Sequence, residues 1–280
     1  MIDIREAIRS GAIVPNHRLG QCFLANREVA ANIIKAAELT PGDHVIEVGP
    51  GVCALTEMLC EQAGSVTAVE IDRRLSDTIN GVMARYKNFT LLTANILDIA
   101  ADQLLPPVGD IVLVSNMPYS ISTPLMTRLF EEFTFVKKAV LMMQTDVSRK
   151  LLAEPSTPDY CMLTVFARLY CSPKRLFIVS PHSFAPQPNV ESAVMLLKAR
   201  RTPLIGNGPD RAMFFRVVRA AFASRRKTLD NSLLLAGLAS GRAQAEKATA
   251  LANIPPGARG ESLNAAQYAA LAQILASNNP

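Results

Sequence analysis

The sequence lacks any apolar run long enough to cross a bilayer, which would need about 20 consecutive apolar residues. Its first residues, MIDIREAIRSG, mix acids with bases and contain no apolar core segment, so we expect no secretory signal peptide. Internal repeats and low-complexity stretches are also lacking. Instead, 49% of the residues are hydrophobic and the charged fraction is ordinary, which favours a globular fold with a substantial core.

Metal-binding and disulfide patterns are lacking as well. The cysteines are odd in number and form no CxxC pair, at Cys22, Cys53, Cys60, Cys161 and Cys171. This argues against a disulfide framework and against a zinc site. The histidines form no obvious catalytic cluster, at His17, His44 and His182. We therefore expect a protein of the reducing cytoplasm that holds no metal.

Charge is distributed unevenly along the chain. Residues 1–197 contain 17 Lys and Arg against 20 Asp and Glu, whereas residues 198–280 contain 12 against 4. A slightly acidic body with a strongly basic tail favours a polyanionic partner such as nucleic acid. Many soluble domains are basic for other reasons, so charge alone leaves both interpretations open.

Short apolar runs alternate with helical patterns over the first two thirds of the chain. We expect strands at 44–49, 65–72, 89–94, 110–116, 138–144, 175–180 and 192–198. Helices are expected between them at 54–62, 73–86, 123–133 and in a segment that ends at 152. Near-continuous apolar strands that alternate with helices indicate an α/β fold with a mostly parallel sheet covered on both faces.

The stretch RRTPLIGNGPD at 200–210 has the composition of a linker, and the pattern beyond it is entirely helical. Apolar and basic side chains there fall on separate faces of one expected helix, with Phe215, Val218 and Phe222 on one and Arg216, Arg219 and Arg226 on the other. The sequence thus predicts an α/β domain over residues 1–200 and a small basic helical domain over 201–280.

The ends of the first two strands carry residues that are typical of a cofactor site. The first strand ends in Gly49 and is followed by Gly51, where glycines permit a close backbone approach and the next helix offers unpaired N–H groups. Glu70 ends the second strand, where an acid can bind both ribose hydroxyls. GPGVCA also fits the pattern of nicotinamide enzymes, and an isolated segment of this kind is commonly a plain turn. The strand context and Glu70 favour an adenosine-containing cofactor.

The fourth strand runs into Asn116-Met117-Pro118-Tyr119, at the same edge of the expected sheet. Alone, this tetrapeptide is an ordinary strand-ending turn. Beside a cofactor site it suits methyl transfer to the exocyclic amine of adenine, which is a poor nucleophile. The Asn116 side-chain oxygen and a backbone carbonyl fixed by Pro118 can accept hydrogen bonds from that amine. The ring of Tyr119 can stack on a base drawn out of its helix.

These motifs resemble those of the ribosomal RNA adenine dimethyltransferases of the KsgA/RsmA type. The resemblance covers nearly the whole chain and several motifs in the same order. They are HRLGQCFL (17–24), EVGPGVCALTE (47–57), VEID (69–72), TANILDI (93–99), NMPYSIS (116–122), SFAPQPNVESAV (183–194) and RRKTLDNSL (225–233).

The resemblance implies a class I, Rossmann-like methyltransferase domain with a seven-stranded sheet and a helical C-terminal domain that docks on RNA. It implies an S-adenosylmethionine site made by Gln21, Cys22, Leu24, Gly49, Gly51, Glu70, Ile71, Asn95 and Asn116. It further implies that the target adenine is held by Asn116, Pro118, Tyr119 and Phe184.

The implied substrate is a pair of adjacent adenosines in the RNA of an assembling small ribosomal subunit, and we expect the chain to act as a monomer. In this setting the run Arg225-Arg226-Lys227 is a candidate phosphate contact. A solvated helix face is an equally good interpretation of that run.

Four positions depart from the pattern of the family. Cys22 stands where the family has Asn or His, Cys53 replaces a glycine, Asn95 replaces an Asp, and Cys161 replaces another glycine. Asn95 keeps a carbonyl acceptor but loses the charge that makes such bonds strong. Cys53 costs about 1 kcal/mol or more if its φ is positive. We therefore expect an active enzyme with a looser cofactor pocket.

Two alternatives remain open. Large-subunit rRNA adenine methyltransferases that confer macrolide resistance share the N-x-P-Y/F motif; RRKTLDNSL favours the small-subunit type, although Asp230 replaces the Arg of that segment. A non-catalytic RNA-binding or ribosome-assembly factor on the same scaffold would explain Cys53 and Asn95, and the intact NMPY opposes it.

Overall fold

The computed structural model describes residues 3–105, 110–202, 204–206, 208–224 and 226–278. The chain folds into two compact units, one of residues 1–148 and 173–199 and the other of residues 149–172 and 200–280. The chain passes from the first unit to the second between Ala199 and Arg200, beside the domain boundary predicted from the sequence. The second unit also includes residues 149–172, which the sequence pattern assigned to the first domain.

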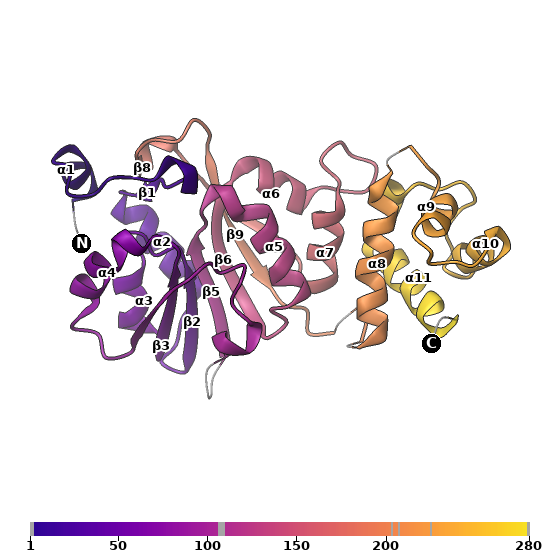
Figure 1. Cartoon of the computed structure of the whole chain (residues 1–280), viewed down its shortest axis with the longest axis horizontal. Helices are drawn as coiled ribbons and strands as arrows, with labels where there is room; N and C mark the ends of the chain where they lie inside the picture. Colours follow the sequence, from indigo (N-terminus) through magenta and orange to yellow (C-terminus); the bar gives the residue numbers. More distant parts are fainter. Residues whose placement is uncertain (1–2, 106–109, 203, 207, 225, 279–280) are drawn as a thin grey trace. The chain divides into compact units, whose positions relative to one another are not determined.

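Within the described residues, seven strands of the first unit form one sheet in the order β4-β3-β2-β5-β6-β9-β7 (Figure 1). Strands β2 to β6 are parallel, and β9 is antiparallel to both of its neighbours. The predicted mostly parallel, seven-stranded α/β fold is therefore confirmed. The strands are β2 (Asp43–Val48), β3 (Ser65–Glu70), β4 (Phe89–Thr93), β5 (Asp110–Asn116), β6 (Val136–Gln144), β7 (Lys174–Val179) and β9 (Ser192–Lys198).

Both faces of the sheet are covered, which explains why its strands are continuously apolar. In β5, the four residues 111–114 are all buried although successive side chains point to opposite faces. Val112 and Val114 belong to a core that includes Ile33 and Leu59 from the helices on their side. A strand with one wet face would instead alternate apolar and polar residues.

The helices of the first unit are α1 (Ile4–Arg9), α2 (Arg27–Ala37), α3 (Thr56–Gln62), α4 (Ser76–Met83) and α5 (Ser122–Glu131). Helix α6 (Thr145–Leu152) begins in the first unit and ends in the second. The helix expected from residue 54 begins at Thr56, because residues 51–55 form a turn. Among the described residues, no helix combines the length and apolarity needed to span a bilayer.

A small second sheet escapes prediction from the sequence. Strands β1 (Phe23–Leu24) and β8 (Phe184–Ala185) pair antiparallel, with Leu24 opposite Phe184. Two-residue strands are too short to show a periodicity. Their pairing ties the segment before α2 to the segment before β9, and both segments carry predicted site residues.

The second unit is helical, with α7 (Met162–Tyr170), α8 (Pro209–Ala223), α9 (Leu229–Leu235), α10 (Arg242–Leu251) and α11 (Ala265–Asn278). Aromatic side chains fill its core; Phe166 meets Phe215 edge to face with ring centroids 4.7 Å apart. As predicted, Phe215 and Val218 are buried while Arg216 and Arg219 are exposed. The predicted place of Arg226 on the same helix is wrong, because α8 ends at Ala223.

Candidate active site

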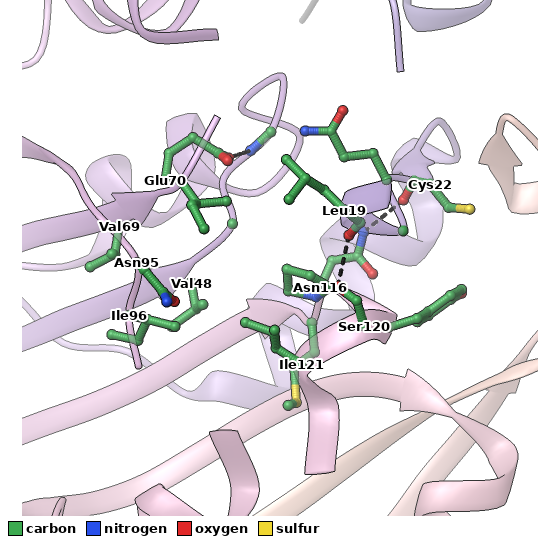
Figure 2. Close-up of a pocket in the computed structure, with 18 of the residues that line it drawn as sticks. Leu19, Cys22, Val48, Val69, Glu70, Asn95, Ile96, Asn116, Ser120 and Ile121 are labelled. Carbon is green, nitrogen blue, oxygen red and sulfur yellow. Dashed lines mark hydrogen bonds between the residues drawn. The ribbon is translucent and has the colours of Figure 1, made fainter. Parts of the chain in front are cut away.

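A pocket of about 720 Å³, including its open mouth, lies at the carboxyl ends of β2, β3, β4 and β5 (Figure 2). Strands β2, β3 and β4 follow one another toward one edge of the sheet, and β5 and β6 follow one another toward the other edge, so the strand order reverses between β2 and β5. Doubly wound folds bind ligands at such a reversal. The place of the pocket therefore fits a cofactor.

Most of the predicted cofactor and base-holding residues line this pocket: Gln21, Cys22, Gly49, Gly51, Glu70, Ile71, Asn95, Asn116, Pro118 and Tyr119. Leu24 and Phe184 do not. Leu24 lines a smaller pocket beside the first, and Phe184 is buried in β8 opposite it. Their contacts with cofactor and base stay predictions.

Gly49 and Gly51 have the positive φ angles of 68° and 57° that favour glycine. A Cβ on Gly49 would lie 3.0 Å from the side chain of Pro118, and one on Gly51 would lie 2.9 Å from the ring of Phe23. The loop after β2 thus packs directly on the loop after β5. The absence of a side chain at Gly49 is what lets the predicted cofactor loop and the predicted reaction loop share one pocket.

Glu70 ends β3 with its carboxylate held by backbone groups. The N–H of Asp72 donates to Oε1 at 2.9 Å, and the N–H of Gly51 donates to Oε2 at 3.2 Å. Burial raises the pKa of Glu70, an effect that these two N–H donors oppose. Each carboxylate oxygen keeps a further lone pair for a ligand hydroxyl. The side chain is therefore pre-oriented at the end of the pocket where Figure 2 also shows Asn95 and Val69.

A segment from Asn16 to Cys22, here called the strap, forms one wall of the pocket and is fastened at three points. The Gln21 side-chain amide donates to Asp72 Oδ2 at 3.0 Å, and its oxygen accepts the N–H of Asn16 at 2.7 Å. Ser120 Oγ donates to the carbonyl of Leu19 at 2.9 Å. The third point is the carbonyl of Cys22, which accepts from Asn116.

The bond between Asn116 and Cys22 orients the predicted catalytic amide. Asn116 Nδ2 donates to the carbonyl oxygen of Cys22 at 3.2 Å (Figure 2). With the amide nitrogen engaged there, the Oδ1 atom remains as the acceptor of the group. This is the orientation that accepting a hydrogen bond from a substrate amine requires.

Tyr119 opens a short 3₁₀ helix, η4 (Tyr119–Ile121), directly after Pro118. Its hydroxyl lies 2.7 Å from Ser192 Oγ, the first residue of β9. Burial raises the pKa of Tyr119, so the phenol is neutral at physiological pH. Ser192, Asp72 and Ser120 all lie inside the motifs quoted from the sequence, but no local pattern indicated that their side chains contact the site.

Cys53 shows the backbone strain anticipated from the sequence, with a φ of 67°. An L-residue in this region costs about 1–3 kcal/mol. The side chain is buried in the core and does not line the pocket, so it does not crowd a ligand there. Any effect on the cofactor has to pass through the backbone of the loop.

Asn95 lines the pocket, and its side chain forms hydrogen bonds with residues of its own loop. Its Oδ1 accepts the N–H of Leu97 at 3.1 Å, and its Nδ2 donates to the carboxylate of Asp98 at 2.9 Å. A carboxylate thus lies within hydrogen-bond distance of position 95, on Asp98. Two other departures also have hydrogen-bond partners. The N–H of Cys161, just before α7, donates to Thr164 Oγ1 at 3.1 Å, and Asp230 accepts a bond from Thr249 at 2.9 Å.

Glu47 is the most unusual titratable group near the pocket. It is 1% exposed, and its Oε2 has no hydrogen-bond partner among the described residues. Burial raises its pKa to about 8, with Glu70 adding to the effect and Thr56 opposing it. The group is therefore mostly protonated at neutral pH. It lines the smaller pocket that adjoins the first.

Of the predicted RNA-contacting run, Arg225 lies outside the described residues. Arg226 and Lys227 are exposed in the turn between α8 and α9. The predicted helical placement of these two residues is therefore wrong, whereas their solvation agrees with their exposure; their role as a phosphate contact stays a prediction.

Comparisons with known proteins match residues 14–277 to the family described as "Ribosomal RNA adenine dimethylase". A relative in Pelotomaculum thermopropionicum, ribosomal RNA small subunit methyltransferase A, is 39% identical over 279 residues, which cover 96% of this chain and 94% of the relative. The solved dimethyladenosine transferase of Plasmodium falciparum superposes with a TM-score of 0.71 at 24% identity, covering 89% of this chain and 95% of that one. The 23S rRNA methyltransferase ErmE superposes with a TM-score of 0.66 at 28% identity, covering 90% and 99%.

Proposed function

Because the chain belongs to the ribosomal RNA adenine dimethylase family, we propose that it methylates the N6 amines of adjacent adenosines in small-subunit rRNA during ribosome assembly. It is an S-adenosylmethionine-dependent methyltransferase. The observation that carries the proposal is the single pocket in which Glu70 and the oriented amide of Asn116 both lie. The higher identity to a small-subunit enzyme than to ErmE favours the small subunit.

The pocket fits S-adenosylmethionine. Glu70 would bind the ribose hydroxyls, Ile71 would pack on the adenine, and Asn95 would meet the adenine amine. Because Gly51 packs closely on Phe23 and has no side chain, the loop after β2 presents its backbone to the pocket. Gln21 and Cys22 of the strap would cover the ligand from the other side. When bound, the cofactor supplies an electrophilic methyl group.

The residues of this chain then prepare the acceptor amine. Asn116 Oδ1 and the carbonyl next to Pro118 accept its two N–H groups, which turns the nitrogen lone pair away from conjugation with the ring. The ring of Tyr119 stacks on the base and holds it out of the RNA helix. Oriented acceptors of this kind act mainly by positioning, and a shift of about 1 Å costs roughly a hundredfold in rate.

RNA docking is assigned to the basic residues of the helical unit, with Arg226 and Lys227 as phosphate contacts. Residues 200–280 of that unit carry 11 Lys and Arg against 4 Asp and Glu, which complements a polyanion. Since the substrate is an assembling ribosomal particle, we place the reaction in the cytoplasm and expect the chain to act as a monomer without a metal.

The proposal is tested by mass spectrometry of rRNA from a strain that lacks this gene. Dimethyladenosine should disappear from small-subunit RNA, return with the wild-type gene and stay absent with Asn116→Ala. Disappearance from large-subunit RNA would support the activity of ErmE instead. Unchanged methylation of both RNAs would support a non-catalytic assembly factor and contradict the proposal.

A further inference from the structure

We propose that Ser192 is a positioning residue of the reaction, whose buried hydroxyl holds the ring of Tyr119 where it stacks on the target adenine. The inference rests on the proposed function, in which Tyr119 provides that stacking surface. Ser192 would touch neither the base nor the cofactor and would act only through Tyr119.

Ser192 is a fixed anchor. It is fully buried and begins β9, which pairs with β6 on one side and β7 on the other. Its ladder partners are Gln144 and Val179. The backbone of Ser192 is thus fixed by a strand on each side, so its Oγ can move only by rotation about χ1.

Tyr119, by contrast, does not lie in a strand of the sheet. It lies in the three-residue helix η4 and is half-buried at the pocket. Its hydroxyl makes the 2.7 Å bond to Ser192 Oγ, and no other hydrogen bond of that hydroxyl is found among the described residues. The far end of the ring is therefore fixed by β9, and the near end by the loop after β5.

The geometry of a tyrosine explains what this bond can do. The hydroxyl lies on the long axis of the ring, so a bond to it fixes the direction of that axis and hence χ1. Without it, the side chain is freer to leave this χ1 position for the other two staggered ones, in which the ring points in a different direction. The bond thus sets the fraction of bound bases that are correctly stacked.

The choice of serine at this position is otherwise unexplained. The following residues, Ala193 and Val194, are apolar and equally buried. A buried hydroxyl without a partner is unfavourable, and Ser192 Oγ finds its partner in Tyr119. The hydroxyl is therefore accounted for by the site and not by the packing of the sheet.

The test is a double-mutant cycle with the full-length protein, comparing wild type, Ser192→Ala, Tyr119→Phe and the double variant. Methyl transfer to unmethylated small subunits gives kcat and KM, and calorimetry gives the affinity for S-adenosylmethionine. We expect Ser192→Ala to lower kcat about threefold to tenfold, as for one lost hydrogen bond. KM for the particle and the cofactor affinity should stay within about twofold of wild type. Because both single changes break the same bond, the double variant should be no slower than Tyr119→Phe.

Ser148→Ala is the matched control. Ser148 is also fully buried, and its hydroxyl donates to the carbonyl of Thr145 at 2.8 Å. It does not line the pocket, so its loss should reduce stability without changing kcat. Ser192→Thr keeps the hydroxyl and should restore most of the rate lost in Ser192→Ala.

Fluorotyrosine labelling gives a readout that a purely structural role would not change. The chain has only five tyrosines, so the signal of Tyr119 can be assigned by its loss in Tyr119→Phe. That signal should shift and broaden in Ser192→Ala but not in Ser148→Ala. Equal slowing by Ser192→Ala in the Tyr119 and Tyr119→Phe backgrounds, or no slowing in either, would overturn the positioning role. If the wild type itself transfers no methyl group, the proposed function fails instead.

Discussion

At the scale of single residues, Asn95 and Asp98 show how a departure from the family's motif is accommodated. The family's acid is replaced by an amide, and the amide donates to a carboxylate three positions further along the chain. The atom that would meet the adenine amine is therefore uncharged, and the carboxylate of Asp98 lies beside it in the same loop. An acid restored at position 95 alone would face Asp98 directly.

We predict that exchanging the two residues strengthens cofactor binding. Asn95→Asp combined with Asp98→Asn keeps the charge of the loop and places it at the pocket, where a charge-assisted bond should gain about threefold to tenfold in affinity. Asn95→Asp alone should gain less, because two carboxylates then lie side by side. Calorimetric titration with S-adenosylmethionine measures both. Equal affinity of wild type and the exchanged variant would contradict the expected weakening by Asn95.

Glu47 gives a second residue-scale prediction, for stability. Its pKa of about 8 in the folded state lies above the value of about 4.3 in an unfolded chain, so folding takes up a proton between these pH values. Stability should fall as pH rises through this window, by up to about 5 kcal/mol in total. Glu47→Gln, which stays neutral, should remove this loss. Urea unfolding from pH 5 to pH 8 checks it, and parallel curves for the two proteins would show the account of Glu47 to be wrong.

At the scale of elements, the strap joins the two ends of the pocket. Its Gln21 is held by Asp72 after β3, and its carbonyl groups are held by Asn116 and Ser120 after β5. Arg74 and the amide of Gln21 both donate to Asp72, and they lower its pKa to about 2. The carboxylate is thus charged at any physiological pH and can hold the strap throughout.

We predict that Asp72→Ala loosens the strap and shortens the residence of the cofactor. Loss of a hydrogen bond to a charged group, worth about 1.5–3 kcal/mol, should raise the dissociation rate of S-adenosylmethionine roughly tenfold or more. Arg74→Gln removes the other partner of Asp72 but leaves Gln21 in place, so it serves as the control and should have little effect. Stopped-flow dissociation measures both rates, and equal acceleration by the two variants would argue against the strap.

The sequence predicts an element well when its hydrophobic pattern extends over several residues, and poorly when the element is short. All seven strands of the large sheet were predicted within about two residues of their ends, because continuous apolar runs of this length reflect burial on both faces. The β1–β8 pair and the contacts of Asp72 and Ser192 were not. They join residues far apart in the chain, and a single sequence carries no periodic signal for such pairs. Phe184 illustrates the limit: its motif was recognised, yet it lies in β8 and not on the pocket wall.

At the scale of the whole molecule, charge is divided between the ends of the chain. The part up to residue 197 is slightly acidic and the remainder is strongly basic. A phosphate backbone is bound mainly by such basic residues, with release of counterions. Binding should therefore depend steeply on salt, and cofactor binding in the first unit should not.

We predict that replacing Arg226 and Lys227 by alanine weakens RNA binding and lowers the slope of log affinity against log salt by about 1.5. Lys35→Ala with Lys87→Ala is the matched control, because it removes the same charge from exposed positions in the first unit. Filter binding of small-subunit RNA at several salt concentrations measures the slopes. An unchanged slope in the first variant, or the same change in both, would remove these two residues from the RNA-binding surface.

We propose above that this chain methylates adenosine N6 amines in small-subunit rRNA. The most direct test is the transfer of labelled methyl groups from S-adenosylmethionine to unmethylated small ribosomal subunits by the purified protein, followed by nucleoside analysis. We predict label in N6,N6-dimethyladenosine of the small-subunit RNA, lost in Asn116→Ala although that variant still binds RNA. Wild-type protein that binds both cofactor and particle but leaves the RNA unlabelled would contradict the claim.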